Sequence, residues 1–123
     1  MKRGQALTML LFTVSISLMV VTASVMIIAA NSLSVSHVES GSLAYHIAES
    51  GLEDALMRLL RDPAAAEGTL TVGLGQATVI VTGSDPLVVT STGRLGNFVR
   101  SVRADVSYTG GIMTVSSWQE VFN

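Results

Sequence analysis

Residues 6–30 read ALTMLLFTVSISLMVVTASVMIIAA, and this stretch decides the fold. Nineteen of its 25 residues are apolar, and it contains no Asp, Glu, Lys or Arg. At about 1.5 Å per helical residue, the stretch is long enough to cross a bilayer core of about 30 Å. The sequence therefore predicts a membrane-spanning helix over residues 5–30 and excludes a globular protein of the cytosol.

The charges on either side of this stretch predict its orientation. Lys2 and Arg3 are the only basic residues before Arg58, and the first acidic residue is Glu39. Basic residues favour the cytoplasmic side, so we expect the N-terminus inside and the C-terminal domain outside the cytoplasmic (inner) membrane. The run is longer than the 7–15 apolar residues typical of a secretory signal, which argues against cleavage of the whole segment. A plain anchor, and an anchor that also serves in assembly, both stay open.

The polar residues inside the span are all Ser or Thr, and some repeat at intervals of seven residues. Thr8, Ser15 and Thr22 form one such series, and Ser17 and Ser24 form another. Small side chains in a stripe let helices approach closely, although Ser and Thr are also simply tolerated in membrane helices. The positions expected to pack in the membrane or in a filament core are Leu7, Thr8, Met9, Leu11, Phe12, Ser15, Leu18 and Thr22.

The helical pattern continues beyond the membrane span, over residues 31–63. Large apolar residues follow helical spacing there and are expected to pack against a sheet: Leu43, Ile47, Leu52, Leu56 and Leu59. Asp62 and Pro63 predict the end of the helix. The Ser-rich residues 31–42, with Gly41, could bend or interrupt it.

From residue 64 to residue 123 the pattern changes to alternation broken by turn residues. Strands are expected over residues 69–74, 76–82, 87–92, 97–108 and 112–122, with a turn over residues 93–96. A sheet of this size has one apolar face to cover, and the amphipathic half of the helix is the only large partner in the chain. The predicted fold class is α+β, with a long N-terminal helix packed on a small antiparallel sheet of about four to five strands.

Two short motifs carry a resemblance to a known family. Lys2-Arg3-Gly4 directly before the apolar run resembles the class III signal of type IV pilins and type II secretion pseudopilins. Together with Gln5-Ala6-Leu7, the stretch AESGLE at residues 48–53 is most similar to PilX-type minor pilins.

The resemblance implies a fold, a processing step and a set of partners. Residues 1–4 would be a leader, cleaved between Gly4 and Gln5 by a prepilin peptidase, and the new terminus could be methylated. The helix and sheet would form a ladle shape. The partners would be other pilin subunits, the membrane and the pilus assembly platform, with no small-molecule substrate. The protein would begin in the membrane and end in an extracellular or periplasmic filament.

Met9 departs from the family pattern. Major pilins generally carry Glu at the fifth position of the mature chain, which is position 9 here if cleavage follows Gly4. The absence of this Glu is similar to the tip pseudopilin and to some minor pilins, so we expect a minor subunit that primes or caps assembly. A major pilin, and a monomeric membrane-anchored binding or adhesion module, are the alternatives. The residues do not choose between adhesion, motility, DNA uptake and secretion, nor between a bacterial and an archaeal lineage.

The sequence offers no catalytic or metal-binding constellation, so we expect neither an enzyme nor a cofactor. There is no cysteine, which excludes disulfides and thiolate ligands. His37 and His46 lack a third ligand at metal-binding spacing. Glu49 and Glu53 are one helical turn apart, but they are interpreted as surface or subunit-contact residues because no nucleophile or cleft is indicated nearby.

The charge balance argues against nucleic acid as a partner. Residues 31–123 carry five arginines and nine acidic residues, a net charge of −4. Arg94, Arg100 and Arg103 could still form a small basic patch, although no cluster of aromatic residues accompanies them. Arg100 breaks the alternation of its strand, and we expect it at a bulge or at the rim of the sheet. Trp118 could offer an exposed aromatic for adhesion, but we expect it in the core, because a lone Trp in a strand is usually buried.

Overall fold

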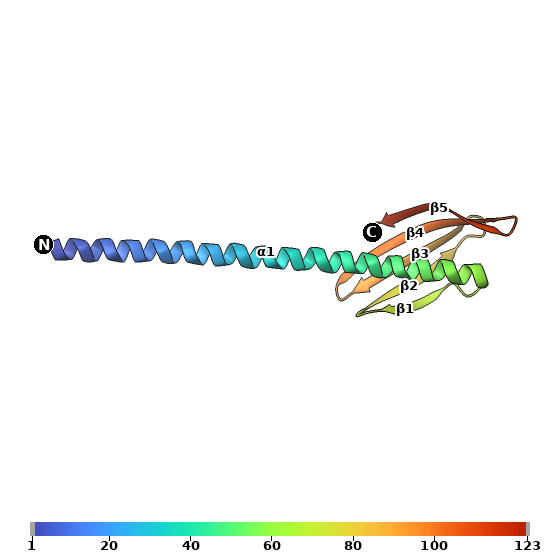
Figure 1. Ribbon diagram of the computed structural model, residues 1–123, viewed down its shortest axis with the longest axis horizontal. Helices are drawn as coiled ribbons and strands as arrows, with labels where there is room; N and C mark the ends of the chain where they lie inside the picture. Colours follow the sequence, from blue (N-terminus) through green and yellow to red (C-terminus); the bar gives the residue numbers. More distant parts are fainter. Residues whose placement is uncertain (1, 123) are drawn as a thin grey trace. The chain divides into compact units, whose positions relative to one another are not determined.

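A computed structural model describes residues 2–122 of the chain (Figure 1). It contains one helix, α1 (Lys2–Arg61), followed by β1 (Gly68–Val72), β2 (Gly75–Thr82), β3 (Leu87–Leu95), β4 (Phe98–Thr109) and β5 (Ile112–Val121). The chain divides into two compact units, residues 1–37 and residues 38–123. Met1, the first residue of the expected leader, lies outside the described residues.

Residues 31–42, including Gly41, are part of α1, so the helix is not interrupted there. Its C-terminal end follows from local chemistry. The Arg58 carbonyl accepts a hydrogen bond from the Asp62 amide at 2.8 Å, and the Asp62 carboxylate accepts one from the Ala64 amide at 3.0 Å. Pro63 cannot continue the helix. Tyr108 of β4 donates its hydroxyl to the Leu59 carbonyl at 2.7 Å, which satisfies one of the free carbonyls at the helix end.

The five strands form an antiparallel sheet in the order β1-β2-β3-β4-β5, and this confirms the predicted α+β fold class. The largest difference from the expected boundaries is in β3, which extends to Leu95. The turn predicted at Gly93 is therefore wrong, because Gly93 pairs with Arg100 within the ladder. The turn follows at Gly96, which has a φ of 58° that favours glycine.

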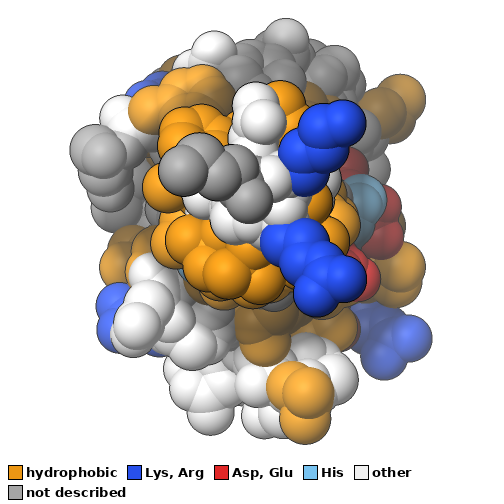
Figure 2. Space-filling view, turned by 90° about the vertical axis from the view of Figure 1, so that its left-hand side faces the viewer, with side chains coloured by type: hydrophobic (Ala, Val, Ile, Leu, Met, Phe, Trp, Pro, Cys, Tyr) orange, Lys and Arg blue, Asp and Glu red, His pale blue; other side chains and the backbone are white. Residues whose placement is uncertain are grey.

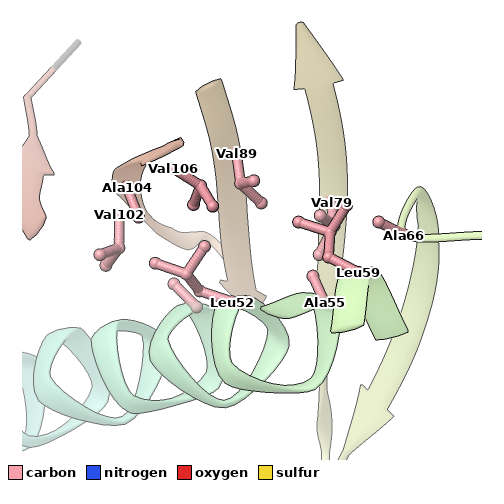
Figure 3. Close-up of a cluster of buried hydrophobic side chains, with 10 residues drawn as sticks. Leu52, Ala55, Leu59, Ala66, Val79, Val89, Val102, Ala104 and Val106 are labelled. Atoms are coloured by element: carbon pink, nitrogen blue, oxygen red, sulfur yellow. The ribbon is translucent and has the colours of Figure 1, made fainter. Parts of the chain in front are cut away.

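The core of the second unit lies between one face of the sheet and residues 44–59 of α1 (Figure 3). Leu52 and Leu59 point from the helix toward Val89, Val102 and Val106 of the sheet, and all five side chains are fully buried. Burying a side chain of this kind contributes about 1.5–3 kcal/mol relative to leaving it in water. The sheet therefore depends on the helix for its apolar cover.

Small residues bring the helix backbone against the sheet. A Cβ added to Gly51 would collide with Ala77 and would lie 2.6 Å from the Ser91 Oγ, and a Cβ on Gly93 would collide with the Ala44 carbonyl and the Ala48 amide. The helix side of this contact, which we call the small-residue seam, consists of Gly41, Ala44, Ala48, Gly51 and Ala55. Their alternating spacing of three and four residues keeps them on one helix face.

Candidate functional site

The first half of α1 presents a large apolar surface. Its large apolar side chains between Leu7 and Ile28 are each 53–72% exposed. Within the described residues α1 is the one helix long and apolar enough to cross a membrane, and none of its most apolar window is buried. Figure 2 looks onto the N-terminal end of the chain, where hydrophobic side chains gather with basic side chains beside them. A surface of this size is unstable in water, so it needs lipid or other protein to cover it.

The predicted packing positions all lie on this exposed surface. Leu7, Met9, Leu11, Phe12 and Leu18 are each about two-thirds exposed. Which of them meet lipid and which meet protein stays a prediction.

The hydroxyl groups in the apolar half are bonded within the helix. Thr8, Ser15 and Thr22 each donate to the carbonyl four residues earlier, at 2.8–2.9 Å. Ser17 and Ser24 do the same. Because each hydroxyl has its partner on its own helix, lipid or a neighbouring helix can cover the stripe without an unsatisfied polar group.

The junction between Gly4 and Gln5 lies in the first turns of α1 and is exposed. A Cβ added to Gly4 would meet no other atom within 4 Å. The Gly4 backbone is helical, without the positive φ that would require glycine. The fold of the described chain therefore places no demand for glycine at this position, in contrast to Gly51 and Gly93.

The residues predicted to pack between helix and sheet differ in burial. Ile47, Leu52 and Leu59 are buried, and Leu56 is half-buried against the core. Leu43 departs from the prediction, since its side chain is 47% exposed. It borders an apolar hollow of about 270 Å³ with Val72 and Leu74, at the end of the sheet where the β1–β2 turn lies. Sequence reasoning missed Gly41, Ala44 and Gly51, although their spacing in the sequence could have revealed the seam.

The three arginines do not form one patch. Arg100 faces the helix side of the sheet, where its Nη1 lies 2.8 Å from a Glu120 carboxylate oxygen and its guanidinium 6.0 Å from the Phe122 ring centre. Arg103 lies on the other face and is paired with Asp105 at 3.0 Å. The possible basic patch is therefore wrong. Arg100 lies near the rim of the sheet, and the bulge occurs elsewhere, between Asp105 and Val106.

The remaining candidates for chemistry are surface groups. The His46 Nδ1 lies 3.5 Å from a Glu49 carboxylate oxygen, and Glu53 is exposed. Among residues 2–122, no group of three or more His, Cys, Asp or Glu side chains could hold a metal ion. The prediction that Trp118 is a core residue is wrong, because this side chain is 38% exposed on the edge strand β5.

The arrangement of the described residues has two parts. It combines an exposed apolar helix with a small domain that is held to the continuation of the same helix by the small-residue seam. Comparison of the chain with protein-family models, curated proteins and solved structures finds no match.

Proposed function

We propose that this protein is a structural subunit of a type IV pilus-like filament, stored in the cytoplasmic membrane before assembly. The apolar half of α1 spans the membrane with its N-terminus inside and the sheet outside. A prepilin peptidase removes residues 1–4, and the apolar half then exchanges lipid for the equivalent helices of neighbouring subunits. The alternative is a monomeric anchored binding module, which would keep residues 1–4.

The exposed apolar half of α1 carries this proposal. Its large side chains are exposed, and its hydroxyls are satisfied internally. Such a helix can be covered by lipid or by helices of its own kind. Because lipid is already apolar, association in a filament relies on close packing of the Ser and Thr stripe rather than on the hydrophobic effect.

Gly4 supports the processing step. Since neither backbone conformation nor crowding requires glycine there, a requirement from outside the fold is the simplest reason for a glycine between the basic residues and the apolar run. Glycine costs about 1 kcal/mol relative to alanine in a helix, so it is not favoured for helix stability.

Met9 supports a minor role for the subunit. A carboxylate at this position would pair with the amino terminus of a neighbouring subunit, and both charges would be costly in an apolar medium without each other. Met9 cannot make this pair. A subunit without the carboxylate suits the start or the tip of a filament, where there is no such amine to neutralise.

The experiment that tests the proposal replaces Gly4 with leucine in the full chain. We expect Gly4→Leu to insert in the membrane, to keep residues 1–4 and to be absent from sheared filaments, as measured by intact mass and by blotting of both fractions. The matched control is Ala30→Leu, which makes a similar increase in size at the far end of the apolar half. A wild-type chain whose intact mass still includes residues 1–4 would contradict processing after Gly4. Quantitative mass spectrometry of the filaments then tests the minor role, which fails if this chain is the most abundant subunit.

A further inference from the structure

We propose that the sheet makes a second contact, in which the free edge of β5 pairs with the free edge of β1 in a second copy of this chain. The order of strands leaves β1 and β5 with one unpaired side each. This contact goes beyond the proposed function, because it joins the sheets of two subunits rather than their apolar helices. The edge contact depends on the proposed membrane anchoring in one respect: anchoring gives the two copies the same direction.

Neither free edge carries Lys, Pro or an unpaired charge. Exposed edge strands in proteins are commonly protected by Lys, by Pro or by inward-pointing charges. Strand β1 (GTLTV) has no charge, and β5 (IMTVSSWQEV) has only Glu120, whose carboxylate is held by Arg100. Two copies can therefore bring these edges together without burying an unpaired charge.

The edge of the sheet is protected against pairing beside β1 but not along β1 itself. Strand β2 extends beyond β1, and its Val81 amide donates to the Glu67 carboxylate at 3.0 Å. The carboxylate thus occupies a backbone donor that would otherwise be open at this edge. Only the five residues of β1 are left available for another strand.

The lengths of the two free edges match. The bulge between Asp105 and Val106 places an extra residue, Ser116, in β5 and so divides this strand. The part beyond the bulge, residues 117–121, is five residues long, as is β1.

The faces of the two edges also match. Leu70 of β1 pairs with Ala77, which contacts the helix, so Leu70 and Val72 lie on the helix side and Thr69 and Thr71 on the outer side. On β5, Trp118 pairs with Ala104 of the core and is on the helix side. Pairing the two edges would place the apolar side chains of β1 beside the partly exposed Trp118.

Strand direction and sheet face together select β1 rather than β5 as the partner edge. In an antiparallel meander the first, third and fifth strands run in one direction, so β5 and the β1 of a copy in the same orientation pair in parallel. Figure 1 shows the strands running roughly along the helix segment of the second unit. Antiparallel pairing of β5 with a second β5 would reverse the direction of one copy, and parallel pairing would place the helix sides of the two copies on opposite faces of the joined sheet. Only pairing with β1 keeps both the direction and the face.

Cysteine cross-linking tests this contact directly, because the chain has no cysteine of its own. The full chain with Thr71→Cys and Gln119→Cys together is expressed in membranes and oxidised mildly. Paired strands lie about 4.8 Å apart, within the reach of a disulfide. We expect a ladder of dimers, trimers and larger species, and single variants that stay monomeric. Ser117→Cys and Val121→Cys replace Gln119→Cys in parallel samples, so that a shift of two residues is detected.

The matched control moves one cysteine a single strand inward. Thr78 pairs with Thr69 and lies on the same outer face, so Thr78→Cys is about 5 Å further from the edge and out of reach of β5. The proposal is overturned by no ladder from any β5 position, by an equal ladder from the control, or by dimers from Gln119→Cys alone. Carbonate extraction of the same membranes reports anchoring separately, so a failure of insertion is distinguished from a failure of edge pairing.

Discussion

The two halves of α1 share a pattern of small residues but differ in what covers it. Thr8, Ser15 and Thr22 are seven residues apart in the first half, and Gly41, Ala48 and Ala55 are seven apart in the second. The second series meets the sheet, where all three residues are buried, whereas the first series is exposed. The comparison shows that the same helical spacing can produce a packed surface or an open one, depending on whether the chain supplies the partner.

The two halves of α1 also use different kinds of small residue. Glycine and alanine allow backbone contact with a sheet, as at Gly51 and Gly93. Serine and threonine in the first half carry a hydroxyl that bonds back to the helix, which suits a surface covered by lipid or by another helix. The second half of α1 is therefore required by the fold of this chain, and the first half is available for other molecules.

The largest expected effect comes from removing the second half of the helix altogether. A fragment of residues 64–123 leaves Val89, Val102 and Val106 uncovered, and we expect it to show no cooperative thermal transition by circular dichroism. A fragment of residues 38–123 keeps the cover and should unfold cooperatively. A sharp transition from the shorter fragment would contradict the dependence of the sheet on the helix.

Gly93→Val tests the backbone contact at the seam. Valine favours strands, so any loss must come from the collision of its Cβ with the Ala44 carbonyl and the Ala48 amide. We expect the free energy of unfolding of the second unit to fall by about 3 kcal/mol or more. The matched variant in the first half, Ala23→Val, should leave it unchanged, as measured by denaturant unfolding in detergent. Equal losses from both variants would remove the distinction between the halves.

Leu52→Ala and Leu18→Ala compare the same truncation in the two halves. Leu52 is fully buried and Leu18 is 68% exposed. We expect Leu52→Ala to lower the free energy of unfolding of the sheet by about 2–5 kcal/mol, and Leu18→Ala to have no measurable effect on it. Thermal unfolding of the full chain in detergent measures both values. A comparable loss from Leu18→Ala would indicate that the first half also supports the sheet.

The smallest effect is expected at Ser91, which lies under Gly51. Its Oγ is buried without a hydrogen-bond partner among the described residues. Replacing it with alanine removes an unsatisfied group at almost constant shape, so Ser91→Ala should raise the free energy of unfolding by about 1 kcal/mol. Ser101→Ala is the control, because the Ser101 Oγ lies 3.1 Å from the Thr92 Oγ and its loss should destabilise. Destabilisation by Ser91→Ala would mean that its hydroxyl finds a partner in solution.

The sequence predicted the α+β fold class because its two periods are clear. Helical spacing of large residues ends at Asp62 and alternation begins a few residues later. The seam was missed because glycine and alanine contribute little to an apolar pattern, although they decide how closely two elements approach. Gly93 was predicted in a turn because glycine is common in turns. Its sequence neighbours do not reveal that the helix backbone packs against it.

Edge positions were also out of reach of sequence reasoning. Trp118 has the alternation of a core residue, but burial depends on how far the helix extends over the sheet, and β5 is an edge strand. The arginines are a different case, because Arg100 and Arg103 are three residues apart on β4 and strand alternation alone places them on opposite faces. The sequence could therefore have shown that they do not share a patch. For the apolar half, the sequence predicts that lipid or other protein covers it. It does not predict which of the two does so.

The small-residue seam has a mechanical consequence for a chain that is pulled along its helix. One helical turn is 5.4 Å, and a slip of that length would bring one small residue of the seam to the place of the next. The seam alone therefore sets the distance between helix and sheet but offers little resistance to sliding. Leu52 and Leu59, inserted among the valines of the sheet, and the bond from Tyr108 to the Leu59 carbonyl resist it. Under tension, these three residues act as the stop that keeps the helix from being drawn out of the sheet.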